Sequence, residues 1–148
     1  MLELPTIRPS GWKDTVSNCD ATGEFVFNLV TQTLLTSMSQ SSAAIPLDES
    51  EFEFCGLESA PSYRVVPPRV AQSPAALECR VVEIRQLQGL NGVPCQSWFT
   101  IGEVIGIYLD PAFITEAGRF DTAKAAIPTR CGYQDYMEAG DLFELTRP

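Results

Sequence analysis

The sequence contains no histidine, and this absence removes the side chain most often used as a metal ligand or as a general base. A zinc site is not expected, because the five cysteines are scattered and form no Cys-x-x-Cys pair. Catalytic arrangements that pair a serine or a cysteine with a histidine base are excluded for the same reason. Proton chemistry must therefore come from carboxylates, tyrosines, cysteines, lysines or a cofactor.

Positive charge is also scarce, with 10 lysines and arginines against 19 acidic residues and a net charge of −9. This balance argues against nucleic acid and against an anionic membrane surface as partners, since both favour a basic patch. No apolar run approaches the roughly 18 residues of a membrane span, and no secretory signal is evident. The scattered cysteines predict free thiols in a reducing compartment, so we expect a cytoplasmic protein.

A length of 148 residues suits one domain, which we assign to residues 1–148. The first half has short helical signals, and the second half is rich in strands. We expect helices at residues 13–22, 31–40 (with Thr31 as its cap) and 51–57. We expect strands at 24–30, 77–84, 98–109 and 141–145, the first of them in the sheet interior, with a hairpin connection at 87–94.

Residues 98–109 give the strongest strand signal. Apolar side chains at alternate positions share one face, on which Glu103 is the exception. Gly102 and Gly106 lie on the other face, and two glycines four residues apart predict sharp curvature or a close backbone approach. These patterns together predict a mainly β protein, an antiparallel barrel with short helical insertions.

The turn Arg8-Pro-Ser-Gly-Trp-Lys-Asp-Thr15 is a candidate anion site. Arg8, Ser10, Lys13 and Thr15 can all donate hydrogen bonds to a phosphate, and a helix N-terminus beside them adds free backbone N–H groups. The chain has only two lysines, and one of them is here. The alternative interpretation is that Arg8 and Lys13 are solvated turn charges, that Thr15 bonds locally, and that Asp14 only meets the helix dipole.

Five tracts resemble the flavin reductase-like proteins. They are the turn just described with Thr22-Gly-Glu-Phe25, Pro67-Pro-Arg-Val-Ala-Gln-Ser-Pro-Ala-Ala-Leu-Glu-Cys79, Ile101-Gly-Glu-Val-Ile-Gly106, Gly132-Tyr-Gln-Asp-Tyr136 and the closing Asp141-Leu-Phe-Glu-Leu-Thr-Arg-Pro148. Their order and spacing are similar to the branch of the FMN-binding split-barrel family that includes flavoredoxin and monooxygenase reductase components.

The resemblance implies an antiparallel split β-barrel, a homodimer, and FMN held near the dimer interface. It implies that the turn contributes cofactor-binding residues, Arg8, Ser10, Lys13, Asp14 and Thr15, which contact the flavin phosphate. We add Tyr133 as a ligand-pocket residue, and packing at the rim of the core is the alternative for Tyr133 and Tyr136. Family members carry strands upstream of this turn, so we expect an N-terminally shortened barrel.

Two functions remain open at this point. In the first, the protein binds FMN and transfers reducing equivalents from NADH or NADPH to flavin or to a partner monooxygenase. In the second, a shortened barrel has lost flavin and acts as a cofactor-free isomerase or cyclase, or as a dimeric module that binds a small organic ligand. The missing strands would supply much of the flavin slot, so we expect weak or lost FMN binding, no metal, and no identifiable catalytic residue.

Overall fold

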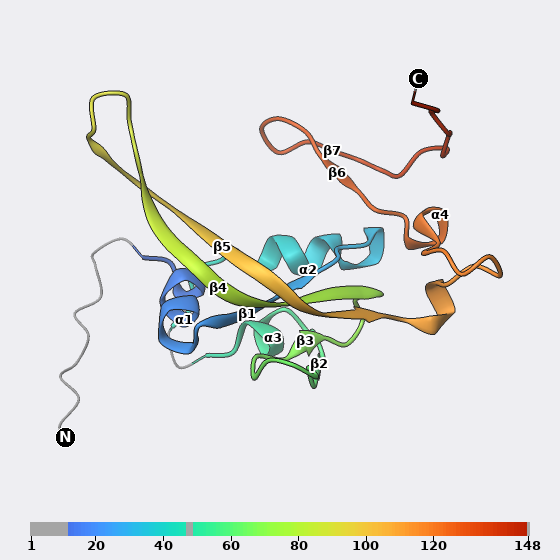
Figure 1. Ribbon diagram of the computed structural model, residues 1–148, viewed down its shortest axis with the longest axis horizontal. Coiled ribbons are helices and arrows are strands. Elements are labelled where there is room, and N and C mark those ends of the chain that lie inside the picture. Colours follow the sequence, from blue (N-terminus) through green and yellow to red (C-terminus); the bar gives the residue numbers. More distant parts are fainter. Residues whose placement is uncertain (1–11, 47–48, 148) are drawn as a thin grey trace.

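A three-stranded antiparallel sheet forms the centre of the molecule (Figure 1). The computed structural model describes residues 12–46 and 49–147. The sheet contains β1 (Glu24–Asn28), β4 (Ala75–Gln88) and β5 (Pro94–Leu109), in the order β1-β4-β5. β4 and β5 form one long, curved hairpin, and Gly92 takes a φ of 72° in the turn that connects them. The predicted hairpin connection and the mainly β character are confirmed.

The remaining elements are short and surround this sheet. The helices are α1 (Asp14–Thr22), η1 (Gln32–Leu34), α2 (Leu35–Gln40), α3 (Glu51–Phe54), η2 (Pro111–Phe113) and α4 (Thr122–Ala125). The short strands are β2 (Ser59–Ala60) paired with β3 (Arg69–Val70), and β6 (Thr129–Arg130) paired with β7 (Tyr136–Met137). In Figure 1, α2 lies on one side of the strands, and α3, β2 and β3 lie on the other. None of the helices described is long and apolar enough to cross a membrane.

The first helix ends where the sequence indicates. Lys13 is the extended residue before α1, and its carbonyl accepts hydrogen bonds from the N–H groups of Val16 and Ser17. Gly23 closes the helix at a φ of 68°, which side-chain-bearing residues rarely adopt, and its N–H bonds the carbonyl of Cys19 at 2.9 Å. The turn from helix to strand therefore needs a glycine here, and β1 begins at the next residue.

Three register shifts along the β4–β5 hairpin change which side chains share a face, and the first lies between Glu78 and Cys79. Glu78 pairs with Gly106 while the next residue, Cys79, pairs with Val104, so Ile105 is the extra residue of a bulge. The odd-numbered apolar face predicted for residues 98–109 is therefore interrupted. Phe99, Ile101, Ile107 and Leu109 are exposed, and Ile105 is half-buried. The close approach predicted at the glycines is confirmed at Gly102, where a Cβ would lie 2.5 Å from the ring of Phe25.

The prediction that residues 24–30 form an interior strand is wrong. β1 covers only Glu24–Asn28 and pairs with β4 alone among the described residues, so it is an edge strand. Phe27 is 55% exposed, so the described residues do not cover the face of the strand on which it lies. Apolar residues on both faces usually indicate a strand flanked on both sides. Here they indicate that the outer edge and one face of β1 need further cover.

Three other expectations need correction. Residues 141–145 form no strand, because no strand edge in the described part of the chain offers them backbone hydrogen bonds, and their side chains are exposed. The helix expected at 31–40 begins as a 3-10 turn, and the Thr31 hydroxyl meets that of Thr33 at 2.9 Å instead of capping it. β4 and β5 extend beyond the predicted 77–84 and 98–109, since their polar outer ends still pair with each other.

Candidate functional site

A groove of about 460 Å³ lies between α1, β1, α3 and the segment that contains β3. This volume is within the range of small-molecule sites, roughly 300–1,000 Å³. Its wall is mostly apolar, with polar groups contributed by α1, β1 and α3. The lining residues are Thr15, Asn18, Cys19, Thr22, Glu24, Phe25, Val26, Asn28, Ser41, Glu51, Phe52, Leu57, Pro67, Pro68 and Val70.

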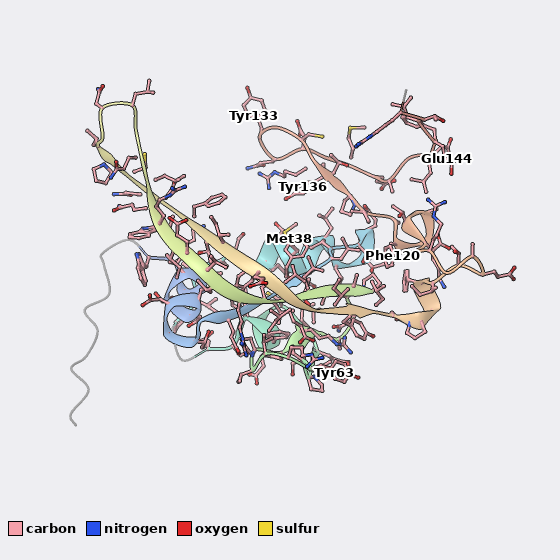
Figure 2. The ribbon with its side chains drawn as sticks, in the orientation of Figure 1. Met38, Tyr63, Phe120, Tyr133, Tyr136 and Glu144 are labelled. Atoms are coloured by element: carbon pink, nitrogen blue, oxygen red, sulfur yellow. The ribbon has the colours of Figure 1, made fainter. Side chains whose placement is uncertain are left out.

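The groove continues along β1 toward α2 as an apolar hollow of about 250 Å³. The two cavities share five residues, Val26, Asn28, Ser41, Leu57 and Val70. The hollow adds Leu34 and Met38 from η1 and α2, and Figure 2 shows Met38 on the side of the strands where α2 lies. One continuous surface therefore runs the length of the edge strand.

Backbone groups of β1 face this surface. The carbonyl of Gly23 accepts from the N–H of Val81, and the N–H of Leu29 donates to Ala75, so the odd-numbered residues of β1 bond β4. The even-numbered residues, Val26 and Asn28 among them, direct their backbone groups to the outer edge. Among the described residues, the N–H groups of Val26 and Asn28 have no acceptor. The groove is thus apolar and carries a row of free backbone donors.

Side-chain oxygens on the sheet hold the segment with β2 and β3 in place. The buried carboxylate of Glu78 accepts hydrogen bonds from the backbone N–H groups of Tyr63 and Arg64. Glu24 accepts from the N–H of Val66 at 2.8 Å, and Asn28 accepts from that of Val70 at 2.9 Å. Three polar side chains of the sheet therefore form the scaffold of the groove, and its far wall depends on them.

The predicted phosphate residues lie partly within the described chain. Arg8 and Ser10 are outside it. Lys13 and Thr15 are exposed at the start of α1, and Thr15 lines the groove. Asp14, beside them in sequence, lines an adjoining hollow of about 330 Å³ that shares Asn18, Glu51 and Phe52 with the groove. The structure therefore places Thr15 in the groove and Asp14 in the hollow next to it, and the exposed Lys13 is not among the residues that line either one.

Tyr133 lies far from this group. It occupies the tip of the β6–β7 hairpin and is 95% exposed (Figure 2). α1 is at the opposite side of the molecule, beside β1 (Figure 1). Tyr136 is half-buried, and its hydroxyl accepts a hydrogen bond from Arg130 at 2.6 Å. Within one chain, the structure does not bring Tyr133 to Lys13 and Thr15.

The groove is short of positive charge. Glu24 and Glu51 line it, and Glu24 is offset by Arg80, whose Nε lies 3.8 Å from the carboxylate. Burial raises the pKa of the Cys19 thiol in its wall, so this sulfur stays protonated at neutral pH. Burial and, secondly, the charge of Glu51 raise the pKa of Cys55. Across residues 12–46 and 49–147, no three His, Cys, Asp or Glu side chains are grouped to hold a metal.

Trp12, the residue before Lys13, packs against the long hairpin. Its ring packs edge-to-face on Trp98, with centroids 5.1 Å apart and planes at 76°. Its indole N–H is buried and has no acceptor among the described residues. The contact holds the residue that precedes Lys13 against β5.

Sequence reasoning missed the residues that build the wall, namely Asn18, Asn28, Phe52 and Glu78. Glu78 carried a usable signal, because it is an acid within the otherwise apolar start of β4. Asn28 is a polar residue in an apolar strand and gave the same kind of signal. Phe52 gave none, since its role depends on where α3 packs.

The family model for the flavin reductase like domain matches residues 6–123 of the chain. An uncharacterized protein of Halalkalibacterium halodurans is 33% identical over 142 residues, which are 95% of this chain and 67% of that protein. The chain thus spans about two thirds of the length of this relative.

Two solved structures are similar in fold and in sequence. Nitrilotriacetate monooxygenase component B from Bacillus cereus has a TM-score of 0.81 and 26% identity, with 93% of this chain and 68% of that chain covered. A Shewanella frigidimarina protein described as a flavin reductase with a split barrel domain has a TM-score of 0.76 and 27% identity, with coverages of 90% and 65%. The antiparallel sheet described above is therefore that of a split barrel.

Proposed function

The chain belongs to the flavin reductase-like domain family, and on that premise we propose that it binds FMN and transfers reducing equivalents from NADH or NADPH to flavin or to a partner monooxygenase. The observation that carries the proposal is the start of α1, where Thr15 lines a groove large enough for an aromatic ligand and the exposed Lys13 lies two residues before it in the sequence. The similarity to a monooxygenase component B supports the same reaction class.

The start of α1 fits a phosphate. Among the described residues, the backbone N–H groups of Asp14 and Thr15 have no acceptor, because the first turn of a helix leaves its amides free. The helix dipole, the Lys13 ammonium and the Thr15 hydroxyl favour an anion at the same point. Arg8 and Ser10 precede α1 in the sequence, and we propose them as further hydrogen-bond donors to the phosphate.

The groove fits the flat part of a flavin better than its phosphate. Its walls are apolar, and its acids, Glu24 and Glu51, oppose a dianion inside. The free N–H groups of Val26 and Asn28 along β1 are suited to the carbonyl oxygens of a pyrimidine edge. When bound, FMN supplies the hydride and electron chemistry, which explains how a chain without histidine can be a reductase. The residues here bind and orient it.

Binding is proposed to be weak. The groove is open along β1, and each hydrogen bond to the ring contributes only about 1 kcal/mol, so a single phosphate clamp leaves affinity low. We propose a cytoplasmic homodimer with one domain over residues 1–148, because the open edges of the sheet need cover. FMN then exchanges readily, as a protein that supplies reduced flavin to others requires.

Oxidation of NADH and NADPH, followed by absorbance at saturating added FMN, tests the proposal. We expect oxidation that depends on both protein and FMN. If the protein adds nothing to the rate of free FMN and does not alter its fluorescence, the protein is not a flavin reductase, and a cofactor-free activity on a small organic ligand becomes the better account.

A further inference from the structure

The outer edge of β1 is open and carries hydrogen-bond donors at the spacing of a strand. Among the described residues, β1 pairs with β4 alone, and the backbone N–H groups of Val26 and Asn28 have no acceptor. These two donors lie one strand repeat apart, about 6.8 Å. An extended chain presents the carbonyl groups of alternate residues at the same spacing, so a strand beside β1 can accept from both donors.

The cavities along this edge leave room for such a strand. The groove of about 460 Å³ and the apolar hollow of about 250 Å³ both include Val26 and Asn28 in their walls. Residues of α1 and α3, such as Asn18 and Phe52, form other parts of the groove wall and do not bond to these donors. The edge is therefore accessible along the part of β1 that carries the free N–H groups.

The charges around this edge all have one sign. Glu24 and Glu51 line the groove, and Asp14 and Glu49 line the hollow that adjoins it at α1. No lysine or arginine is among the described residues that line the groove or either hollow. Arg80 lies 3.8 Å from Glu24, whereas the other three carboxylates form no ion pair within the described part of the chain. The edge therefore favours a ligand with positive charge.

The two sides of the edge differ in chemistry. Leu34 and Met38 line the apolar hollow on the side of α2, whereas Glu51 belongs to α3, which lies on the other side of the strands (Figure 1). The side chains of an added strand alternate between these two sides. One set therefore contacts an apolar wall and the other set faces a carboxylate. A strand in which apolar and basic residues alternate fits both.

We propose that this edge binds an extended segment of a partner protein in which apolar and basic residues alternate. The segment adds a strand to the sheet, its main chain accepts from Val26 and Asn28, and its alternate side chains give the specificity. The inference goes beyond the proposed function, because the interaction needs no flavin. A bound segment occupies the groove proposed for the flavin ring, so the partner also controls access to that site.

A synthetic peptide, Lys-Val-Lys-Val-Lys-Val with an N-terminal fluorescein and an amidated end, tests the proposal by fluorescence anisotropy. The titration uses the whole chain 1–148 without flavin, and we expect saturable binding. Glu-Val-Glu-Val-Glu-Val controls for charge and Lys-Lys-Lys-Val-Val-Val for alternation, and both should bind at least about tenfold more weakly. If the three peptides bind equally, or none binds at millimolar concentration, the inference is wrong while the proposed function still stands.

Two variants of α3 locate the bound peptide in the same titration. Glu51→Lys changes a carboxylate that lines the groove, and Glu53→Lys makes the same charge change on the same helix outside the groove wall. We expect Glu51→Lys to weaken binding at least about fivefold more than Glu53→Lys does. Equal weakening would show that the peptide responds only to the net charge of the protein, and it would contradict binding in the groove.

Hydrogen exchange measured by NMR tests the added strand itself. With saturating Lys-Val-Lys-Val-Lys-Val, the amides of Val26 and Asn28 should exchange at least about tenfold more slowly than in the free protein. Phe25 and Phe27 are internal controls, because their backbone groups already bond β4, and their exchange should change much less. Binding that leaves the exchange of Val26 and Asn28 unchanged would overturn strand addition at this edge.

Discussion

The ring of Phe25 in β1 lies directly over Gly102 in β5, although β4 separates these two strands in the sheet. A Cβ built on Gly102 would lie 2.5 Å from two carbon atoms of that ring and 3.1 Å from the Cβ of Cys79. The aromatic side chain of the edge strand thus reaches across the middle strand and fills the space that the glycine leaves. This contact fixes β1, and with it one wall of the groove, against the long hairpin.

Gly102→Ala should lower the free energy of unfolding by about 1–3 kcal/mol, since the added methyl group must displace a packed ring or a strand. Chemical denaturation monitored by circular dichroism measures this change in the free energy of unfolding. Gly89→Ala is the matched control, because a Cβ there meets only the carbonyl of Val93 at 3.7 Å, and we expect a change within about 0.5 kcal/mol. Equal changes in the free energy of unfolding for the two variants would show that the packing of the Phe25 ring does not require a glycine at position 102.

Glu78→Ala should destabilise the protein by about 1.5–3 kcal/mol, because it removes the buried carboxylate that accepts hydrogen bonds from the backbone N–H groups of Tyr63 and Arg64. It should also increase hydrogen exchange at these two amides, which mass spectrometry of peptides 58–70 can detect. Glu83→Ala is the control, since Glu83 is exposed and pairs only with Arg85 at 3.6 Å. Normal protection of residues 63 and 64 in Glu78→Ala would contradict the role given to this carboxylate.

Alkaline pH should weaken the fold through its buried thiols. Burial raises the pKa of Cys19 and Cys79 above that of an ordinary cysteine, so the folded chain holds these protons more tightly than the unfolded chain. Below that value both states are protonated and the thiols have no effect on stability. As pH rises above it, the unfolded chain ionises first, and the free energy of unfolding falls.

Thermal unfolding from about pH 8 to pH 10.5 should therefore show a declining Tm, with a shallower decline for Cys19→Ala than for wild type. Cys131→Ala is the control, because Cys131 is exposed, and its slope should match that of wild type. A slope that is identical in all three proteins would exclude buried thiols as the source of the decline.

Much of the fold could be predicted from local sequence, because helix ends and turns depend on a few neighbouring residues. Gly23 after α1 and Asn91-Gly92 between β4 and β5 marked their positions correctly. The edge position of β1 could not be predicted, since apolar residues on both faces do not reveal whether a partner strand is present. The bulge at Ile105 also left no local signal, and it changed which face of β5 is exposed.

Of the candidate site, only the part at the first turn of α1 could be predicted from the sequence. Lys13 and Thr15 stand together because they are neighbours in sequence, whereas the groove wall depends on how α3 and the β3 segment pack on the sheet. The position of Tyr133 relative to that wall is a long-range property, and sequence spacing carries no information about it. The strand expected at 141–145 failed for a similar reason, because a strand needs an available edge as well as suitable residues.

FMN titration of wild type, Lys13→Ala and Lys124→Ala, followed by flavin fluorescence, tests the central claim most directly. Lys124 is the only other lysine, and it donates to the carbonyl of Ala112 at 2.6 Å, away from the groove. We expect Lys13→Ala to weaken binding by about 1.5–3 kcal/mol, the contribution of a hydrogen bond to a charged group, and Lys124→Ala to leave affinity unchanged. Equal affinities for all three proteins would contradict the assignment of the phosphate to the start of α1.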